Sequence, residues 1–230
     1  MTIGILQPGY LPWLGFFEQL QKSDVFILYD DVQYDKGGWR NRNKIKTAKG
    51  NQWLTIPVRV KFLQKPLIYE VKIDNTSNWR KNHLLSLHSN YTKADFFKDC
   101  IGIFEEAYNK EWEYLAEIDI YFITRIAEYL GIDVKKIKRS SQLNPKGDKM
   151  ERLINLCKSF GADTFYEGYA GKNYIDDKMF EREGIKVIYQ EYKHPVYQQL
   201  YGEFIPYLSV VDLLFNCGPK SLEIIMNKPL

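Results

Sequence analysis

The sequence predicts an α/β fold: a three-layer, open and mostly parallel sheet of the Rossmann-like kind, with a helical segment inserted between its two halves. Two observations lead to this class. Within residues 2–29 an apolar run, a turn, an amphipathic stretch and a second apolar run follow one another, the order of a strand–helix–strand unit with a right-handed crossover. Short apolar runs alternate with amphipathic stretches again after residue 137, whereas the intervening chain carries apolar side chains at helical spacing.

The first 30 residues supply two strands and the helix between them. Residues 2–6 are a short apolar run, and residues 7–10 (Gln-Pro-Gly-Tyr) turn the chain. A helix is expected from Pro12, because proline needs no N–H in a first turn, to Ser23. Residues 25–29 are apolar throughout, which is typical of a central strand covered on both faces.

The middle of the chain is expected to hold two strands and then helices. One strand is expected over residues 53–58, with Pro57 at a sheet edge or a strand end, and another over 68–73, where polar and apolar side chains alternate. Three helices are expected next, over residues 78–87, 95–108 and 112–129. Gly131 ends the last of them as a C-cap residue.

The last third returns to the alternating pattern, with a helix over 148–160, strands over 164–166 and 185–190, and short helices over 174–183 and 209–215. We therefore divide the chain into an N-terminal α/β half with a basic ligand-binding segment, a helical insertion and a C-terminal α/β half. Their boundaries are 1–75, 76–132 and 133–230. Together the three parts are expected to form one compact domain.

Charge and cysteine content restrict the function classes. A formal net charge of +3 over 230 residues argues against a surface that coats DNA, while a local basic site remains allowed. Cys100, Cys157 and Cys217 lie far apart, so neither a disulfide framework nor a structural zinc site is expected. Neither a signal peptide nor an uninterrupted run of about 18 apolar residues is visible, so we expect a cytoplasmic protein without a membrane span.

A basic segment begins at Trp39 and continues through Arg40, Asn41, Arg42 and Asn43. Arginine offers a fork for phosphate or carboxylate, asparagine offers directional donors and acceptors, and tryptophan offers a stacking face, so the segment suits an anionic ligand. On an extended chain the two arginines face one side and the two asparagines the other, so one pair meets the ligand. The alternative interpretation is a solvated basic loop after a strand.

Polar residues follow several of the predicted strands, where ligands sit in open α/β sheets. The segments are 7–10, 30–34, 140–141 and 167–171, and each also has the composition of a plain turn. Gly9 lies beside a helix N-terminus that can hold phosphate, or is simply a turn residue. Of the adjacent Asp30 and Asp31, one at most faces the site, and we favour Asp30, as a base, a sugar ligand or a magnesium ligand.

The histidines offer one candidate base. His194 lies close to Tyr192 and Tyr197, where it would act as a general base or be an ordinary loop histidine. His83 and His88 are five residues apart, which is not the spacing that places two ligands on one helix face, so no metal site is expected.

Several runs of the chain resemble the WbqC-like protein family, from Gln7 to Gly218. They are QPGYLPWLGFFEQL, DDVQY, WRNRNKIK, the Ser140-Ser141 pair, YAGKNYID and LSVVDLLFNCG. The resemblance implies a bacterial protein of surface polysaccharide (O-antigen, lipopolysaccharide) biosynthesis that modifies an unusual amino sugar. It maps onto Gln7, Pro8, Tyr10, Pro12, Trp13, Trp39, Arg40, Asn41, Arg42, Asn43 and Gly171. The family often carries His where Leu6 stands and Ser-Gly where Glu167-Gly168 stand, so a catalytic role at either position would make this chain an altered member.

The expected catalytic residues are His194 and Asp30. The expected substrate-binding residues are Gln7, Gly9, Tyr10, Trp13, Asp31, Trp39, Arg40, Asn41, Arg42, Asn43, Ser140, Ser141, Tyr169 and Gly171.

Three functions fit these residues. The first is a transferase that forms an amide on a nucleotide-linked amino sugar, with an acyl donor that is an acyl-CoA, a carrier protein or an aminoacyl-tRNA. The second is an ATP-dependent ligase or nucleotidyltransferase-like enzyme that uses ATP with magnesium; the 7–10 turn takes the place of the HxGH turn of such enzymes but lacks both histidines. The third is a non-catalytic protein that binds a nucleotide sugar or RNA. The expected partner is a nucleotide-linked sugar, without DNA, and with RNA only as an acyl-tRNA donor.

Overall fold

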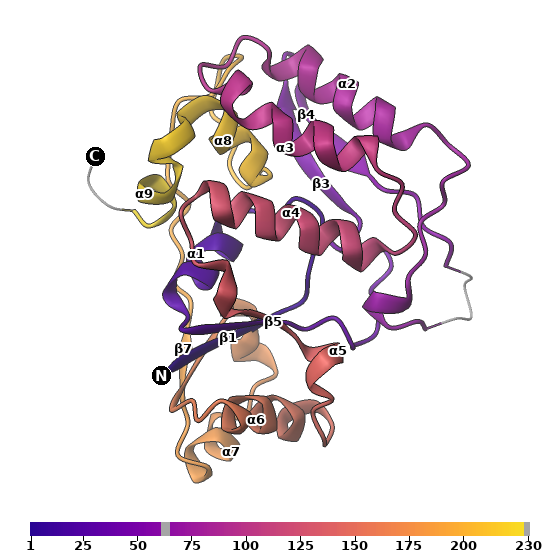
Figure 1. The fold of residues 1–230 in the computed structure, drawn as a ribbon. Helices are drawn as coiled ribbons and strands as arrows, with labels where there is room; N and C mark the ends of the chain where they lie inside the picture. The colour runs from indigo at the N-terminus through magenta and orange to yellow at the C-terminus, as the bar shows by residue number, and fades with distance from the viewer. Residues whose placement is uncertain (61–64, 228–230) are drawn as a thin grey trace.

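A five-stranded parallel sheet forms the centre of the computed structural model, which describes residues 1–60 and 65–227 (Figure 1). Its strands are β1 (Thr2–Leu6), β2 (Val25–Leu28), β5 (Ile137–Arg139), β6 (Thr164–Glu167) and β7 (Lys186–Tyr189). The strand order is β5-β2-β1-β6-β7, and every neighbouring pair is parallel. The chain therefore builds the sheet outward from β1 in one direction and then in the other, which is the doubly wound arrangement that the sequence predicted.

The order of the strands reverses between β1 and β6. These two strands pair with Gly4 opposite Tyr166, so that Gln7 and Glu167 leave the sheet at the same edge. In open α/β sheets a crevice opens outside the carboxyl ends of the strands at this reversal. The topology alone thus places residues 7–10 and 167–171 side by side at a potential binding site.

Helices cover both faces of the sheet. Figure 1 shows α6 (Lys149–Ser159) and α7 (Asp177–Arg182) on one face and α1 (Leu14–Lys22) and α4 (Leu115–Tyr129) on the other. The apolar core is divided in the same way: Ile3 and Ile5 of β1 pack in the cluster that includes α6, whereas the larger cluster lies across the sheet. A strand with a core on each face needs apolar side chains in both directions, as β1 and β2 have.

A helical layer with a hairpin lies beyond α4. Strands β3 (Arg42–Thr47) and β4 (Gly50–Thr55) form an antiparallel pair, with Lys44 opposite Trp53. Helices α2 (Trp79–Tyr91), α3 (Phe97–Asn109), α8 (Val210–Cys217) and α9 (Ser221–Ile225) complete this side of the molecule (Figure 1). Phe104 of α3 packs on both Phe122 of α4 and Phe215 of α8, so the inserted helices share a core with the C-terminal part. The boundaries at 75 and 132 stay a prediction.

Two predicted elements differ from the structure. Residues 68–73 are not a strand: Ile68–Glu70 is a single 3₁₀ turn, and Ile68, Val71 and Ile73 are buried. The spacing of three between Ile68 and Val71 fits a 3₁₀ turn, in which side chains at i and i+3 eclipse, whereas the alternation of Tyr69, Val71 and Ile73 had suggested a strand. The strand expected over 53–58 is shifted, because β4 ends at Thr55. Ser140 and Ser141 open the short helix α5 (Ser140–Leu143).

No helix in the described ranges, 1–60 and 65–227, combines the length and apolar character that crossing a bilayer requires.

Candidate functional site

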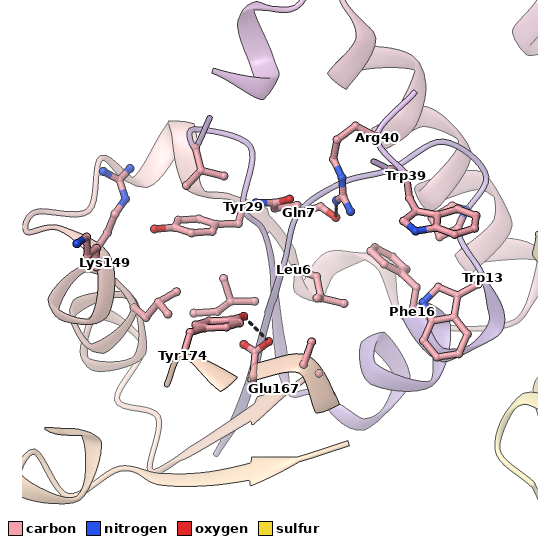
Figure 2. Close-up of a pocket in the computed structure, with 18 of the residues that line it drawn as sticks. Leu6, Gln7, Trp13, Phe16, Tyr29, Trp39, Arg40, Lys149, Glu167 and Tyr174 are labelled. Carbon is pink, nitrogen blue, oxygen red and sulfur yellow. Dashed lines mark hydrogen bonds between the residues drawn. The ribbon is translucent and has the colours of Figure 1, made fainter. Parts of the chain in front are cut away.

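A cavity of about 1060 Å³ opens at the edge where β1 and β6 end (Figure 2). Its walls come from the ends of these strands, the first turns of α1 and α6, and the segment that carries Trp39 and Arg40. A pocket of this size accommodates a drug-sized ligand or a nucleotide sugar. Its position at the strand-order reversal is the one that the fold predicts for a ligand.

Glu167, the last residue of β6, supplies a buried carboxyl group to this cavity. Its side chain is only 5% exposed, and burial raises its pKa to about 7, although hydrogen bonds from the Tyr174 hydroxyl and the Gly168 backbone lower it. The Tyr174 hydroxyl donates to Oε1 at 3.2 Å (Figure 2). A carboxyl group that titrates near neutral pH exchanges a proton readily under physiological conditions, which is what a general acid or base needs.

Gly171 makes room for the Glu167 side chain. A Cβ atom at residue 171 would lie 2.3 Å from Cγ and 3.2 Å from Cδ of Glu167. Only a residue without a side chain fits in this place. Gly171 therefore supports the carboxyl group from behind rather than contacting a ligand.

Gln7 and Leu6 continue the wall from Glu167 along the end of β1 (Figure 2). Arg40 donates through Nη1 to the main-chain carbonyls of Gln7, at 2.9 Å, and Pro8, at 3.0 Å. The side-chain amide of Gln7 is not used in these bonds and lines the cavity. It is therefore available to a ligand as a donor and an acceptor.

The Arg40 segment and the turn after β1 are joined through their main chains. The amide of Tyr10 donates to the Arg40 carbonyl at 3.0 Å, and a Cβ atom on Gly9 would lie 2.9 Å from the carbonyl oxygen of Trp39. The close approach that Gly9 permits is thus an approach of protein backbone, not of ligand. The Arg40 guanidinium also links the two segments, and its Nε lies 3.4 Å from Asp35. Burial lowers the pKa of Arg40.

Aromatic side chains form one side of the cavity. Trp13, Phe16 and Trp39 lie together there with Arg40 (Figure 2). The Trp13 indole occupies space that a side chain at Gly15 would take, because a Cβ atom at Gly15 would lie 2.3 Å from its ring. This side offers stacking and apolar contact to a ligand.

Cationic side chains form the opposite side. Lys149, the first residue of α6, and Tyr29 lie across from the tryptophans in Figure 2, and Arg152 follows one turn later on α6. Arg152 pairs with Asp31 through Nη2, and its guanidinium lies 5.8 Å from the centre of the Tyr29 ring. Lys149, beside the positive end of a helix of 11 residues, favours an anionic group, whereas the charge of Arg152 is offset by Asp31.

The structure brings six of the predicted substrate-binding residues to the cavity: Gln7, Gly9, Trp13, Trp39, Arg40 and Asn43. The other predicted residues do not line it, namely Tyr10, Asp30, Asp31, Asn41, Arg42, Ser140, Ser141, Tyr169, Gly171 and His194.

Asp30 has no free acceptor site on which a substrate would bind. The carboxylate is fully buried and accepts from Arg139 Nε at 2.8 Å, from the Ser141 amide at 2.9 Å and from both serine hydroxyls of the pair 140–141. These bonds anchor the start of α5 to the end of β2. In this arrangement Asp30, Ser140 and Ser141 act as structural supports.

His194 lies behind the cavity wall, and both of its ring nitrogens are engaged. Nε2 accepts from the amide of Tyr207 at 3.1 Å, and Nδ1 lies 2.9 Å from the carbonyl oxygen of Pro195. A general base needs a free lone pair directed at the substrate. With the proton on Nδ1, the lone pair of His194 is on Nε2, and the Tyr207 amide already donates to it. Tyr207 itself lines the cavity, so His194 serves to position it.

The remaining predicted residues make contacts within the protein, and so does the cavity-lining Asn43. Tyr10 is fully buried, and its hydroxyl bonds to His83 Nδ1 at 2.8 Å and to the Tyr108 hydroxyl. Asn41 donates to the Ile56 carbonyl at 2.8 Å, and Asn43 donates to the Leu11 carbonyl at 2.7 Å. Arg42 donates to the carbonyls of Gly37 and Gly38. Tyr169 is 64% exposed and stacks with Lys172.

Residue patterns did not single out Glu167, Tyr174, Lys149 or Arg152 as site residues. Glu167 belongs to a strand-end segment that the sequence did indicate, but its burial depends on Gly171 and on packing that no local pattern reveals. Lys149 and Arg152 resemble any exposed cations of an amphipathic helix.

Comparison with known proteins agrees with the sequence resemblance. The sequence model of the WbqC-like protein family matches residues 7–224. The chain is 37% identical over 221 residues to a protein of Mycobacterium tuberculosis (strain ATCC 25618 / H37Rv) named Uncharacterized protein Rv1507c, and the match covers 95% of each chain. No solved structure matches the chain.

Proposed function

This chain belongs to the WbqC-like protein family, and we propose that it is a transferase that forms an amide, N-acyl or N-aminoacyl, on the amine of a nucleotide-linked amino sugar. The product would serve the assembly of a bacterial surface polysaccharide such as an O-antigen. The observation that carries the proposal is the buried carboxyl group of Glu167, with a pKa of about 7, in the wall of a cavity that is large enough for such a substrate.

Glu167 would act first as a base and then as an acid. An amino sugar is an ammonium ion near neutral pH, and its nitrogen becomes nucleophilic only after the ion gives up one proton to solvent. The nitrogen lone pair then attacks the acyl carbonyl carbon, a C–N bond forms, and the Glu167 carboxylate takes a second proton from the nitrogen. When the tetrahedral intermediate collapses, the bond from carbon to the leaving group breaks, and the proton held by Glu167 passes to that group. The carboxylate is regenerated, and no oxidant or reductant is needed.

The side-chain amide of Gln7 supplies a hydrogen-bond donor beside the carboxyl group. Such a donor stabilises the oxyanion of a tetrahedral intermediate, or it orients a sugar hydroxyl before the reaction. Arg40 Nη1 donates to the main-chain carbonyl of Gln7 at 2.9 Å, which fixes the backbone from which the Gln7 side-chain amide extends. This preorganisation supports a role in catalysis rather than in general affinity.

The diphosphate of the substrate would lie against Lys149 and Arg152 at the start of α6. Of the two residues that the sequence indicated for this role, Arg40 directs Nη1 to the main-chain carbonyls of Gln7 and Pro8, and Arg42 does not line the cavity. The α6 side offers the ammonium group of Lys149 and the N–H groups of a helix N-terminus, which is a familiar way to hold phosphate, while Arg152 also pairs with Asp31 and Asp148 lies beside Lys149.

Calorimetric titration of nucleotide-linked amino sugars tests the proposal. We expect a nucleotide-linked amino sugar to bind to the native chain, and we expect Lys149→Ala to weaken that binding roughly tenfold, because one charge-assisted contact is lost. Lys158→Ala is the matched control, since Lys158 lies on the same helix but pairs with Glu183 at the surface. Absence of binding by every amino sugar, or equal affinity in the native chain and Lys149→Ala, would contradict the proposal.

A second function, an ATP-dependent ligase or nucleotidyltransferase-like enzyme, is favoured by the position of the cavity over the first turn of α1 beside residues 7–10. It predicts that the protein binds ATP with magnesium and releases pyrophosphate or AMP when an acid substrate is added. A binding isotherm flat for ATP with magnesium, together with a positive one for an amino sugar, would leave the transferase as the function to pursue.

A further inference from the structure

A surface of aromatic and cationic side chains continues outward from the cavity, and we call it the Trp39–Trp53 surface. The two indole rings have centroids 5.2 Å apart and planes inclined by 39°. Trp39 is 48% exposed and lines the cavity, whereas Trp53 is 39% exposed and lies on the β3–β4 hairpin. Trp39 thus belongs both to the pocket and to the surface outside it.

Two cationic side chains flank the ring of Trp53, the tryptophan outside the cavity. The guanidinium carbon of Arg42 lies 4.5 Å, and Nζ of Lys44 lies 4.8 Å, from the centre of the Trp53 ring. Residues 35–49 contain six Lys and Arg residues and a single acid, Asp35, which pairs with Arg40. The charges of Arg42 and Lys44 are therefore not offset within this segment, although the net charge of the whole chain is only +3.

The hairpin does not need these side chains for its packing. Asn43, Ile45 and Leu54 point to its inner face and are buried, whereas Arg42, Lys44 and Trp53 lie on the opposite face. Cation–π contacts at exposed positions contribute only about 0.5–1 kcal/mol each. Stability alone thus gives a weak reason for two partly exposed indoles beside two cations.

We propose that the Trp39–Trp53 surface is a second nucleotide site, which holds the adenine nucleotide of an acyl thioester of the coenzyme A type, the acyl donor of the proposed transferase. Exposed indoles stack on a nucleobase, and the flanking cations meet its phosphates. This inference rests on the proposed function. It adds the chemical class of the donor and the place where the donor binds.

Charge favours a single nucleotide over a larger partner. Two flanking cations match the few phosphates of one coenzyme, whereas an RNA chain binds through many phosphate contacts on a strongly basic domain. An acidic carrier protein would meet the cations but has no need of stacked indoles. The thioester arm would pass along Trp39 into the aromatic side of the cavity and bring its carbonyl carbon towards Glu167. There the C–N bond forms, the C–S bond breaks, and the thiolate takes the proton from Glu167.

Calorimetry with coenzyme A as the probe tests this inference. We expect coenzyme A to bind the native chain and Trp53→Ala to weaken this binding roughly tenfold or more, because the loss of one stacking ring costs about 1–3 kcal/mol. The double variant Arg42→Gln/Lys44→Gln should also weaken it and should flatten its salt dependence. Trp112→Phe is the control, because Trp112 packs on Tyr121 and donates to the Ala107 carbonyl, on another part of the molecule.

The outcomes separate this inference from the function on which it rests. Binding of a nucleotide-linked amino sugar should stay within about twofold of the native value in Trp53→Ala, which also shows that this variant is folded. If coenzyme A does not bind, or binds equally well to Trp53→Ala and to the double variant, the second site is refuted while the transferase proposal stands. If a single-stranded RNA ending in CCA binds in a Trp53-dependent manner and coenzyme A does not, the donor class is overturned in favour of RNA. If no amino sugar binds, the proposed function fails first.

Discussion

Gly171 and Glu167 are in such close contact that a single methyl group on the glycine would lie 2.3 Å from Cγ of the carboxylate side chain. The two residues are four apart in the chain, and the short 3₁₀ helix Tyr169–Asn173 folds the glycine back over the end of β6. Glu167, the candidate base, can therefore occupy its position only because residue 171 has no side chain. This relationship leads to the first of four predictions.

Gly171→Ala should lower the turnover of the proposed reaction while the protein stays folded. The added methyl group displaces Glu167 or moves the loop, and overpacking of this kind costs about 1–3 kcal/mol of stability. Turnover and the free energy of unfolding should be measured together. The matched control is Gly102→Ala on α3, where an added Cβ meets nothing within 4 Å. Equal turnover in the two variants would show that the position of Glu167 does not matter for the reaction.

Glu167→Gln should reduce the rate by roughly 10²–10⁴-fold, because the amide cannot accept a proton from the substrate amine. In the native protein the rate should rise with pH through about 7, since the carboxyl group is protonated below its pKa and only the ionised form is a base. The pH–rate profile of the native chain is the measurement, and Glu181→Gln at the exposed surface of α7 is the control. A profile without a titration near pH 7 would contradict the assignment of Glu167.

The same carboxyl group should make stability depend on pH. Its pKa is about 7 in the folded protein and near 4.5 when exposed, so the folded state binds the extra proton between these values, and stability falls as pH rises from about 4.5 to 7. At about 1.4 kcal/mol per pKa unit, the loss is at most on the order of 3 kcal/mol. Urea unfolding at pH 5 and pH 8 should show this loss in the native chain but not in Glu167→Gln. An equal pH dependence in both proteins would rule out a buried, titrating Glu167.

Gly9→Ala should both destabilise the protein and weaken binding of the amino sugar. The new Cβ atom would lie 2.9 Å from the Trp39 carbonyl oxygen, a backbone atom that cannot turn away, so the two segments must separate. Thermal unfolding and calorimetric titration measure the two effects, with Gly102→Ala again as the control. A variant with native stability and native affinity would mean that this contact has no role in shaping the cavity.

The sheet was predictable because its signals are local. Continuous apolar runs identify β1 and β2, and the turn with Pro12 indicates the start of α1, so the parallel arrangement of β1 and β2 and the ligand edge follow from general rules. The error at residues 68–73 has the opposite origin. Local alternation suggested a strand there, but the amides of Ile68 and Tyr69 donate to the main-chain carbonyls of Val32 and Asp30, which lie far away in sequence.

The candidate site was predictable only in part, for a similar reason. Strand ends and the Trp39 segment could be recognised, and six predicted residues line the cavity. Sequence cannot reveal which polar side chains the protein uses for its own bonds: Asp30 is occupied by Arg139 and the serines, and His194 by the Tyr207 amide. Nor can it reveal that burial shifts the titration of Glu167 to neutral pH.

Arg40 reaches the main chain of residues 7 and 8, not their side chains. Any amino acid at position 7 presents the same carbonyl oxygen to the guanidinium, so the joint between the two segments tolerates replacement of Gln7. A change at residue 7 therefore alters the lining of the cavity without loosening this contact between the two segments. A change of Arg40 to lysine would loosen it, because lysine has a single charged nitrogen and cannot reproduce the guanidinium fork.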